Sequence, residues 1–185
     1  MKVQNFYEPL VMKYEEHDIP QIADNEVLIK VKVCGICGSD TSIYTGKYAK
    51  DKLPLITGHE FWGVVEKVGK NAKGVKVGDR VAVDICLTCG TCYFCRHGDG
   101  LLCETFTQLG IHTDGGFAEY VKAPWKNCYQ LPDDMEFTEY SSVQFYVCDR
   151  VTDYGAQKNL MKGALQADME DILKGIQEQK IKSDT

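Results

Sequence analysis

Four cysteines placed close together between residues 89 and 103 constrain the fold of this chain more than any other feature. Cys89, Cys92 and Cys95 follow a C-x2-C-x2-C spacing, and Cys103 comes after seven further residues. Four thiolates on a short glycine-containing loop suit a structural zinc site, with tetrahedral Zn–S bonds of ~2.3 Å and no open position. The surrounding loop, residues 86–104, has no hydrophobic periodicity. Metal binding would therefore replace a core there and couple to folding.

Two other interpretations of the cysteines stay open. Iron–sulfur sites also use C-x2-C-x2-C runs, although here Cys103 follows at a different spacing and without a proline after it. Cysteine is also a small buried hydrophobe, which is our interpretation of Cys34, Cys86 and Cys128. The chain has nine cysteines, an odd number, and its N-terminus lacks the apolar stretch of a signal peptide. We therefore expect a cytoplasmic protein without a disulfide framework.

The overall composition is that of a globular protein. Of the 185 residues, 44% are hydrophobic and 26% are charged, which is enough apolar material for a core of its own. The net charge is -6. An acidic chain without a basic stripe is a poor candidate for binding nucleic acid or an anionic membrane. No apolar run reaches the roughly 20 residues of a membrane span.

The first two thirds of the chain is predicted to be mainly β-structure. Residues 27–33 alternate apolar and charged side chains at their end, which is the period of a half-buried strand. Ser39 and Asp40 are expected to cap a short helical turn near Ile43 and Tyr44. Further strands are expected within residues 1–33 and at 61–68, 81–83 and 117–121.

The last 50 residues have a different pattern. From residue 137 the chain is expected to be helical, and its apolar residues fall in steps of three and four on one face: Met161, Leu165, Met169, Ile172 and Ile176. Gly163 and Gly175 favour two helices over one. We therefore expect two domains, residues 1–136 and 137–185. The apolar helical face either packs on the first domain or pairs between chains in a homo-oligomer.

A resemblance to a known family predicts a second metal site. In order, the chain contains CGICGSD (34–40), GHEFWGVV (58–65), GDRV (78–81), the four-cysteine loop and GGFAEY (115–120). These motifs resemble the zinc-dependent medium-chain alcohol dehydrogenases, in particular the cinnamyl and yeast types. The resemblance implies a GroES-like, partly open β-barrel followed here by C-terminal helices.

The resemblance also implies roles for five residues near the first two motifs. Cys37 and His59 would be ligands of a catalytic zinc, with Glu60 beside the metal and able to enter its coordination shell. Asp40 would be the carboxylate that orients the imidazole of His59, as such carboxylates usually do. Ser39 resembles the hydroxyl that takes the proton from an alcohol bound at the zinc. The parent family interconverts small alcohols and aldehydes, with hydride passing to NAD(P).

A catalytic zinc usually has three protein ligands, so a third residue is needed. Cys148 is the candidate, because residues 148–154 resemble a Cys-Ala-Gly-x-Thr-x-Tyr segment of the family. Asp149 and Arg150 replace the small residues of that segment. The alternative is that Cys148 is a buried free cysteine.

No nucleotide-binding motif follows. A dinucleotide-binding Rossmann domain begins with a G-x-G-x-x-G turn, and no such turn occurs after Thr152. The glycines there, Gly155, Gly163 and Gly175, are too far apart to hold a pyrophosphate. Our hypothesis is that the Rossmann domain has been excised between residues 160 and 167, so that the chain does not bind NAD(P) by itself.

Three functions therefore compete. The first is a dehydrogenase catalytic domain with two zinc sites and no cofactor domain. The second is a zinc-water hydrolase or lyase, since an opened site can activate water at a pKa near ~7. The third is a non-catalytic, zinc-stabilised interaction module. A change in NADH fluorescence on mixing would favour the first. Esterase or CO2-hydration activity that is lost on Cys37→Ser would favour the second. Intact folding and association of His59→Ala, without activity of any kind, would favour the third.

Overall fold

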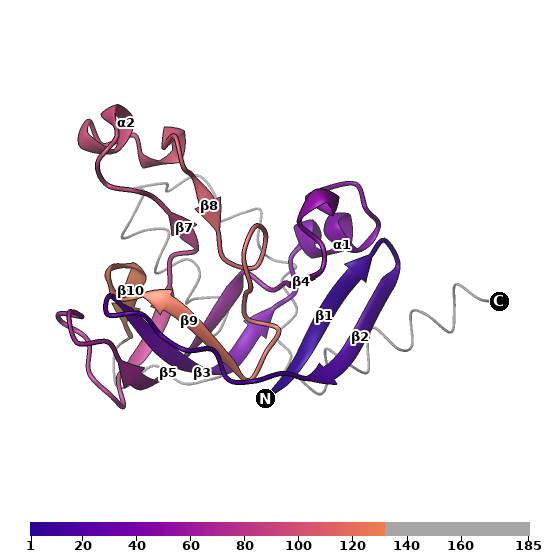
Figure 1. The fold of residues 1–185 in the computed structure, drawn as a ribbon, viewed down its shortest axis with the longest axis horizontal. Helices are drawn as coiled ribbons and strands as arrows, with labels where there is room; N and C mark the ends of the chain where they lie inside the picture. The colour runs from indigo at the N-terminus through magenta and orange to yellow at the C-terminus, as the bar shows by residue number, and fades with distance from the viewer. Residues whose placement is uncertain (132–185) are drawn as a thin grey trace.

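The computed structural model describes residues 1–131, and this part of the chain folds into three antiparallel sheets joined by short helical turns (Figure 1). The first sheet has the order β2-β1-β4, the second β10-β6-β5-β3-β9, and the third pairs β7 with β8. The strands are β1 (Lys2–Glu8), β2 (Val11–Glu16), β3 (Glu26–Gly35), β4 (Leu55–Ile56), β5 (Glu60–Val68), β6 (Arg80–Val83), β7 (Cys86–Leu87), β8 (Thr107–Gln108), β9 (Tyr120–Pro124) and β10 (Cys128–Gln130). The helical turns are α1 (Gly38–Tyr44), η1 (Lys50–Lys52), α2 (Tyr93–Arg96), η2 (Gly100–Leu102) and η3 (Trp125–Asn127).

The five-stranded sheet carries apolar clusters on both faces. Successive side chains of a strand point to opposite faces, and in β5 two neighbouring residues therefore join different clusters. Phe61 joins the larger cluster, which also contains Val27 and Ile29 of β3. Trp62, the next residue, packs with Ala82 in a smaller cluster. The expected strands at 27–33, 61–68 and 81–83 are therefore confirmed as parts of β3, β5 and β6.

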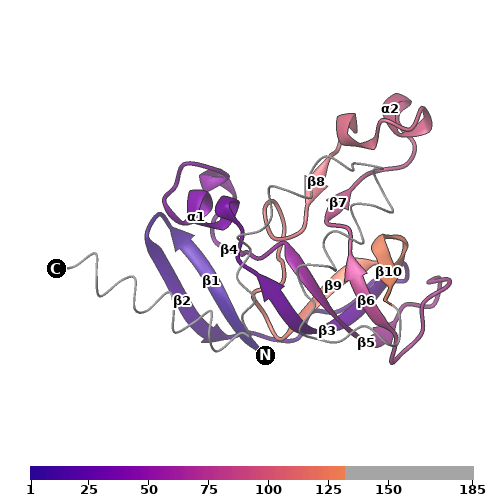
Figure 2. The ribbon, with the colours of Figure 1, turned by 180° about the vertical axis from the view of Figure 1, so that it is seen from behind.

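The four-cysteine segment stands apart from this core. Figure 1 shows α2 and the β7-β8 pair extending away from the five-stranded sheet, and Figure 2 shows the same arrangement from behind. Neither α2 nor η2 contains a buried residue. The absence of hydrophobic periodicity in residues 86–104 thus corresponds to a lobe with almost no core of its own.

Two local predictions were wrong. The helical turn α1 begins at Gly38, with Cys37 as its N-cap, and not at Ser39 or Asp40. The reason is that Asp40 sits at the third helical position, where its carboxylate accepts the N–H of Cys37 at 2.8 Å. The strand expected from residue 117 begins only at Tyr120, because the N–H groups of residues 115–117 bond to the segment before β5 instead.

Several expectations fall outside the described residues. Residues beyond 131 carry the predicted C-terminal helices, the predicted domain 137–185 and its apolar face, which was expected to pack on the first domain or to pair in a homo-oligomer. The predicted ligand Cys148 also lies there. Within residues 1–131, no helix has both the length and the apolar character needed to cross a bilayer.

The carboxylate of Glu15 at the β1-β2 pair provides a test of the fold by pH. It accepts hydrogen bonds from Tyr7 Oη at 2.7 Å and from Asn5 Nδ2 at 3.1 Å, and lies 2.8 Å from His17 Nε2. These partners, Tyr7 first, lower the pKa of Glu15 from 4.5 to about 2. A carboxyl group whose pKa is depressed by folding stabilises the fold above its unfolded pKa, and that contribution is lost as the pH falls through the folded value.

Glu15→Gln should therefore be less stable than the wild type at neutral pH. The difference in free energy of unfolding between the two proteins should shrink as the pH falls from 4.5 towards about 2. Denaturant unfolding at a series of pH values measures it. A difference that stays constant over this range would contradict the assigned hydrogen bonds.

Candidate metal centres

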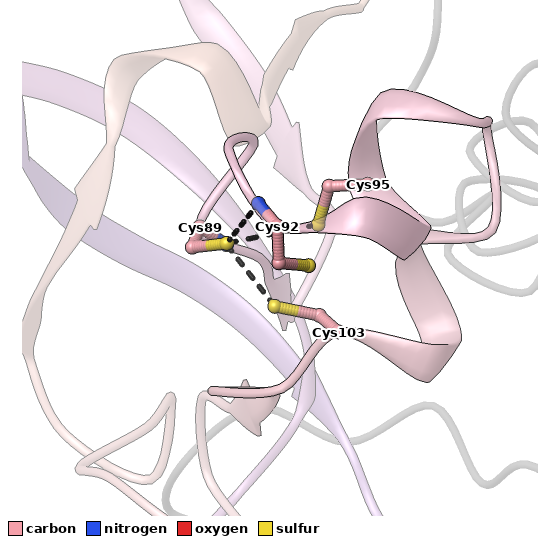
Figure 3. A group of neighbouring side chains, drawn as sticks. All are labelled: Cys89, Cys92, Cys95 and Cys103. Carbon is pink, nitrogen blue, oxygen red and sulfur yellow. Dashed lines mark hydrogen bonds between the residues drawn. The ribbon is translucent and has the colours of Figure 1, made fainter.

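The four cysteines of the lobe face one another (Figure 3). Cys89 precedes α2, Cys92 is the N-cap of α2, Cys95 lies within it, and Cys103 follows η2. Their sulfur atoms all lie within 4.8 Å of one another. Among the described residues, Cys103 is the buried member of the group and Cys89 the exposed one.

Backbone N–H groups already point at the sulfur atoms. Thr91 and Cys92 donate to Cys89 Sγ at 3.4 and 3.3 Å, and Cys89 N–H donates to Cys103 Sγ at 3.3 Å. Hydrogen bonding by Thr91 lowers the pKa of Cys89 to about 5. Donors that stabilise a thiolate prepare it as a metal ligand, because the thiolate is the form that binds metal. The sulfur-only donor set and its convergence fit zinc.

Two residues of η3 connect the base of the lobe, residues 84–88, to the rest of the fold. The sequence patterns did not single these two residues out. Lys126 Nζ donates to the carbonyl of Thr88 at 2.9 Å. The buried Asn127 donates from Nδ2 to the carbonyls of Asp84 and Cys86, at 2.9 and 3.0 Å. Neither residue has a sequence signature, because the partners are backbone atoms about 40 positions away.

The second cluster is built by the pairing of β3 with β5. The register places Gly35 opposite Glu60. Cys37 lies just beyond the end of β3 and His59 just before the start of β5, so this pairing brings them together. Ligand atoms of Cys37, His59 and Glu60 lie within 4.8 Å of one another. His59 and Glu60 are 6% and 5% exposed, whereas Cys37 is half-buried.

Ser39 and Asp40 lie against different ring nitrogens of His59. Ser39 Oγ lies 3.1 Å from Cys37 Sγ and 3.1 Å from His59 Nε2. Asp40 Oδ1 lies 3.4 Å from His59 Nδ1, and its Oδ2 accepts the N–H of Cys37. Asp40 therefore fixes the backbone of one member of the cluster and faces the imidazole of another.

The electrostatics of the cluster follow from this arrangement. Burial lowers the pKa of His59, but Asp40 and Cys37 outweigh burial and raise that pKa to about 10. Hydrogen bonding with His59 is the largest cause that lowers the pKa of Cys37. In addition, His59 Nδ1 and Asp40 Oδ1 are buried without a hydrogen bond of good geometry. A thiol, an imidazole nitrogen and a carboxylate around one point form a donor set that fits zinc.

Nearly all predicted site residues are thus placed. The structure brings together Cys37, Ser39, Asp40, His59 and Glu60 at one site and the four cysteines of residues 89–103 at another. Cys148, the expected third ligand, lies outside the described residues. Cys34 and Cys128 belong to neither cluster; burial raises the pKa of each thiol, to about 12 for Cys128.

Comparison with known proteins identifies the family of this chain. A family model described as the alcohol dehydrogenase GroES-like domain matches residues 23–133. An alcohol dehydrogenase of Geobacillus stearothermophilus is 40% identical over 158 residues, which is 84% of this chain and 45% of that enzyme. The chain spans between 35% and 45% of the length of the first two curated relatives that it matches.

Solved structures give the same relationship. The dehydrogenase RspB of Escherichia coli CFT073, complexed with NADH, is 40% identical, with a TM-score of 0.71 over 80% of this chain and 41% of that one. A cobalt- and zinc-bound thermostable alcohol dehydrogenase from Pyrobaculum aerophilum is 35% identical, with a TM-score of 0.69 over 76% of this chain and 44% of that one. The described fold, mostly β with few helices, is the one these proteins share. The chain therefore belongs to the medium-chain zinc alcohol dehydrogenase family and contains its GroES-like domain.

Proposed function

We propose that this chain is the zinc-binding catalytic domain of an oxidoreductase that interconverts small alcohols and aldehydes. In this proposal Cys37 and His59 hold a catalytic zinc with Glu60 beside it, and the four cysteines of the lobe hold a structural zinc. The observation that carries the proposal is the cluster of Cys37, His59 and Glu60, with Ser39 and Asp40 against it. Cys148 remains the proposed third ligand.

The residues around the cluster have separable tasks in this proposal. When bound, the zinc supplies a Lewis acid that lowers the pKa of an alcohol hydroxyl and polarises a carbonyl. Asp40 faces Nδ1 of His59 and so leaves Nε2 as the ligand atom. Ser39 Oγ, 3.1 Å from both Cys37 Sγ and His59 Nε2, stands where it can accept the proton of a substrate hydroxyl. His59 and Glu60 are themselves buried from water.

The hydride acceptor is proposed to come from outside this chain. The sequence after Thr152 contains no G-x-G-x-x-G turn, which is the feature that binds a pyrophosphate at a helix N-terminus. We therefore propose that the chain does not bind NAD(P) by itself and does not transfer hydride alone. A small alcohol or aldehyde would be its ligand, and the cytoplasm its location.

Cobalt(II) in place of zinc gives a direct test. Adding a short primary alcohol or aldehyde to the cobalt-loaded chain should change the part of the visible spectrum that Cys37→Ser removes. Ser39→Ala should keep the cobalt signal but weaken the response to alcohol. NADH fluorescence should stay unchanged on mixing with the chain. A Cys37-dependent cobalt signal that responds to no alcohol or aldehyde would overturn the proposal.

A further inference from the structure

The backbone just before His59 is held by a second segment, residues 110–117, here named the glycine clamp. Three successive N–H groups of the clamp donate to three successive carbonyls before the imidazole. Gly115 donates to Ile56 at 2.7 Å, Phe117 to Thr57 at 2.9 Å, and Gly116 to Gly58 at 2.7 Å. The carbonyl of the residue that immediately precedes His59 is therefore fixed by the clamp.

Close backbone approach explains why glycines occupy the clamp. A Cβ built at Gly115 or at Gly110 would fall on the carbonyl oxygen of Gly58. Gly110 also has φ +75°, where side chains other than hydrogen are strained. Backbone atoms have little room to yield, so a methyl group at either position must displace Gly58 and with it the start of β5.

The clamp is itself anchored on both sides. The side chain of Asp114 accepts the N–H of Ile56 at 3.1 Å. Gly110 donates to Thr113 at 2.7 Å, which closes the turn within the clamp. At the far end, Gln4 of β1 donates to the carbonyl of Phe117 at 2.8 Å. The clamp can therefore act as a fixed template against which residues 56–58 are set.

We propose that the glycine clamp is the positioning device that aims the imidazole of His59 at Cys37 in the metal site. The proposal rests on the proposed function, since it takes Cys37 and His59 to be metal ligands. No clamp residue belongs to the two clusters of converging ligand atoms in the described residues. Replacing a group that hydrogen-bonds a ligating side chain typically changes metal affinity by about 10–100-fold, and we expect displacement of the backbone before His59 to act on the same scale.

The test compares two glycines with nearly the same φ, +75° at Gly110 and +71° at Gly74. Gly110→Ala places a methyl group against Gly58, whereas Gly74→Ala places one in open space at φ +71°. Both variants place a methyl group at a positive φ, so the contact with Gly58 is what distinguishes Gly110→Ala from Gly74→Ala. The measured quantity is the cobalt(II) affinity of the Cys37–His59 site, read from the part of the spectrum that Cys37→Ser removes.

Gly110→Ala should bind cobalt at this site about 10–100-fold more weakly than wild type, while Gly74→Ala keeps the wild-type affinity. The four-cysteine site should stay loaded in both. Should Gly110→Ala not fold, Asp114→Ala should weaken cobalt binding and Asp114→Asn, which keeps the acceptor oxygen, should restore it. Equal affinity in wild type and the clamp variants overturns the clamp alone. Absence of any Cys37-dependent signal in the wild type overturns the proposed function and the clamp together.

Discussion

Serine in place of Cys103 is expected to remove the zinc from the four-cysteine lobe and to unfold the lobe, while the three-stranded and five-stranded sheets stay folded. Cys103 is 7% exposed and its sulfur accepts the N–H of Cys89. Because α2 and η2 bury no residue, apolar packing within them offers little to replace the metal. Structural zinc binding contributes about 10–16 kcal/mol in zinc-finger peptides, so the loss should be large locally. Zinc content should fall by one per chain.

Limited proteolysis locates the effect, since new cleavage sites should appear between residues 88 and 105. Cys128→Ser is the matched control. Its thiol donates to the carbonyl of Pro124, a bond that a serine hydroxyl can keep, and it belongs to neither cluster. Unchanged zinc content and unchanged cleavage in Cys103→Ser would contradict the assignment of the lobe.

Alanine in place of Asp40 is expected to weaken zinc binding at the Cys37–His59 site by about 10–100-fold. The carboxylate faces His59 Nδ1 with one oxygen and, from the third position of α1, accepts the N–H of the N-cap residue Cys37 with the other. Its removal therefore frees the imidazole and the ligand-bearing turn at once. Loss of the hydrogen bond to Cys37 alone should cost about 1–3 kcal/mol of stability. Competition with a chromogenic chelator measures the affinity.

Asp40→Asn separates the two roles. The amide oxygen can still accept the N–H of Cys37, so α1 should keep this hydrogen bond, but the negative charge beside His59 is lost. Zinc affinity in Asp40→Asn should lie between those of wild type and Asp40→Ala. If Asp40→Ala binds the second zinc as tightly as the wild type, Asp40 has no part in holding the site.

Periodicity and motif spacing predicted much of the fold. Residues 27–33, 61–68 and 81–83 are strands because their apolar side chains alternate or run together against a core, which is a local signal. The proximity of the four cysteines could also be predicted from local sequence, since all four lie within 15 positions. The meeting of Cys37 and His59 was inferred through family resemblance alone. It depends on the register of β3 against β5, which a single sequence does not display.

Two of the three features that were missed are long-range contacts to backbone, and the third is a local one at α1. Asn127 and Lys126 at the base of the lobe bond to carbonyls that any sequence offers. The motif at residues 115–120 overlaps the clamp, but the three hydrogen bonds from residues 115–117 to residues 56–58 have no signature in the sequence. The N-cap of α1 was misplaced because Asp40 serves as an acceptor from within the helix, a role that its residue type alone does not distinguish from a cap.

Zinc per chain, measured by elemental analysis of wild-type protein purified without chelator and of Cys37→Ser, tests whether the chain holds two metal ions. We expect two zincs in the wild type and one in Cys37→Ser, the remaining one held by the four cysteines. One zinc in both proteins would contradict this expectation, because the cluster of Cys37, His59 and Glu60 would then hold no metal and the oxidoreductase proposal would lose its basis.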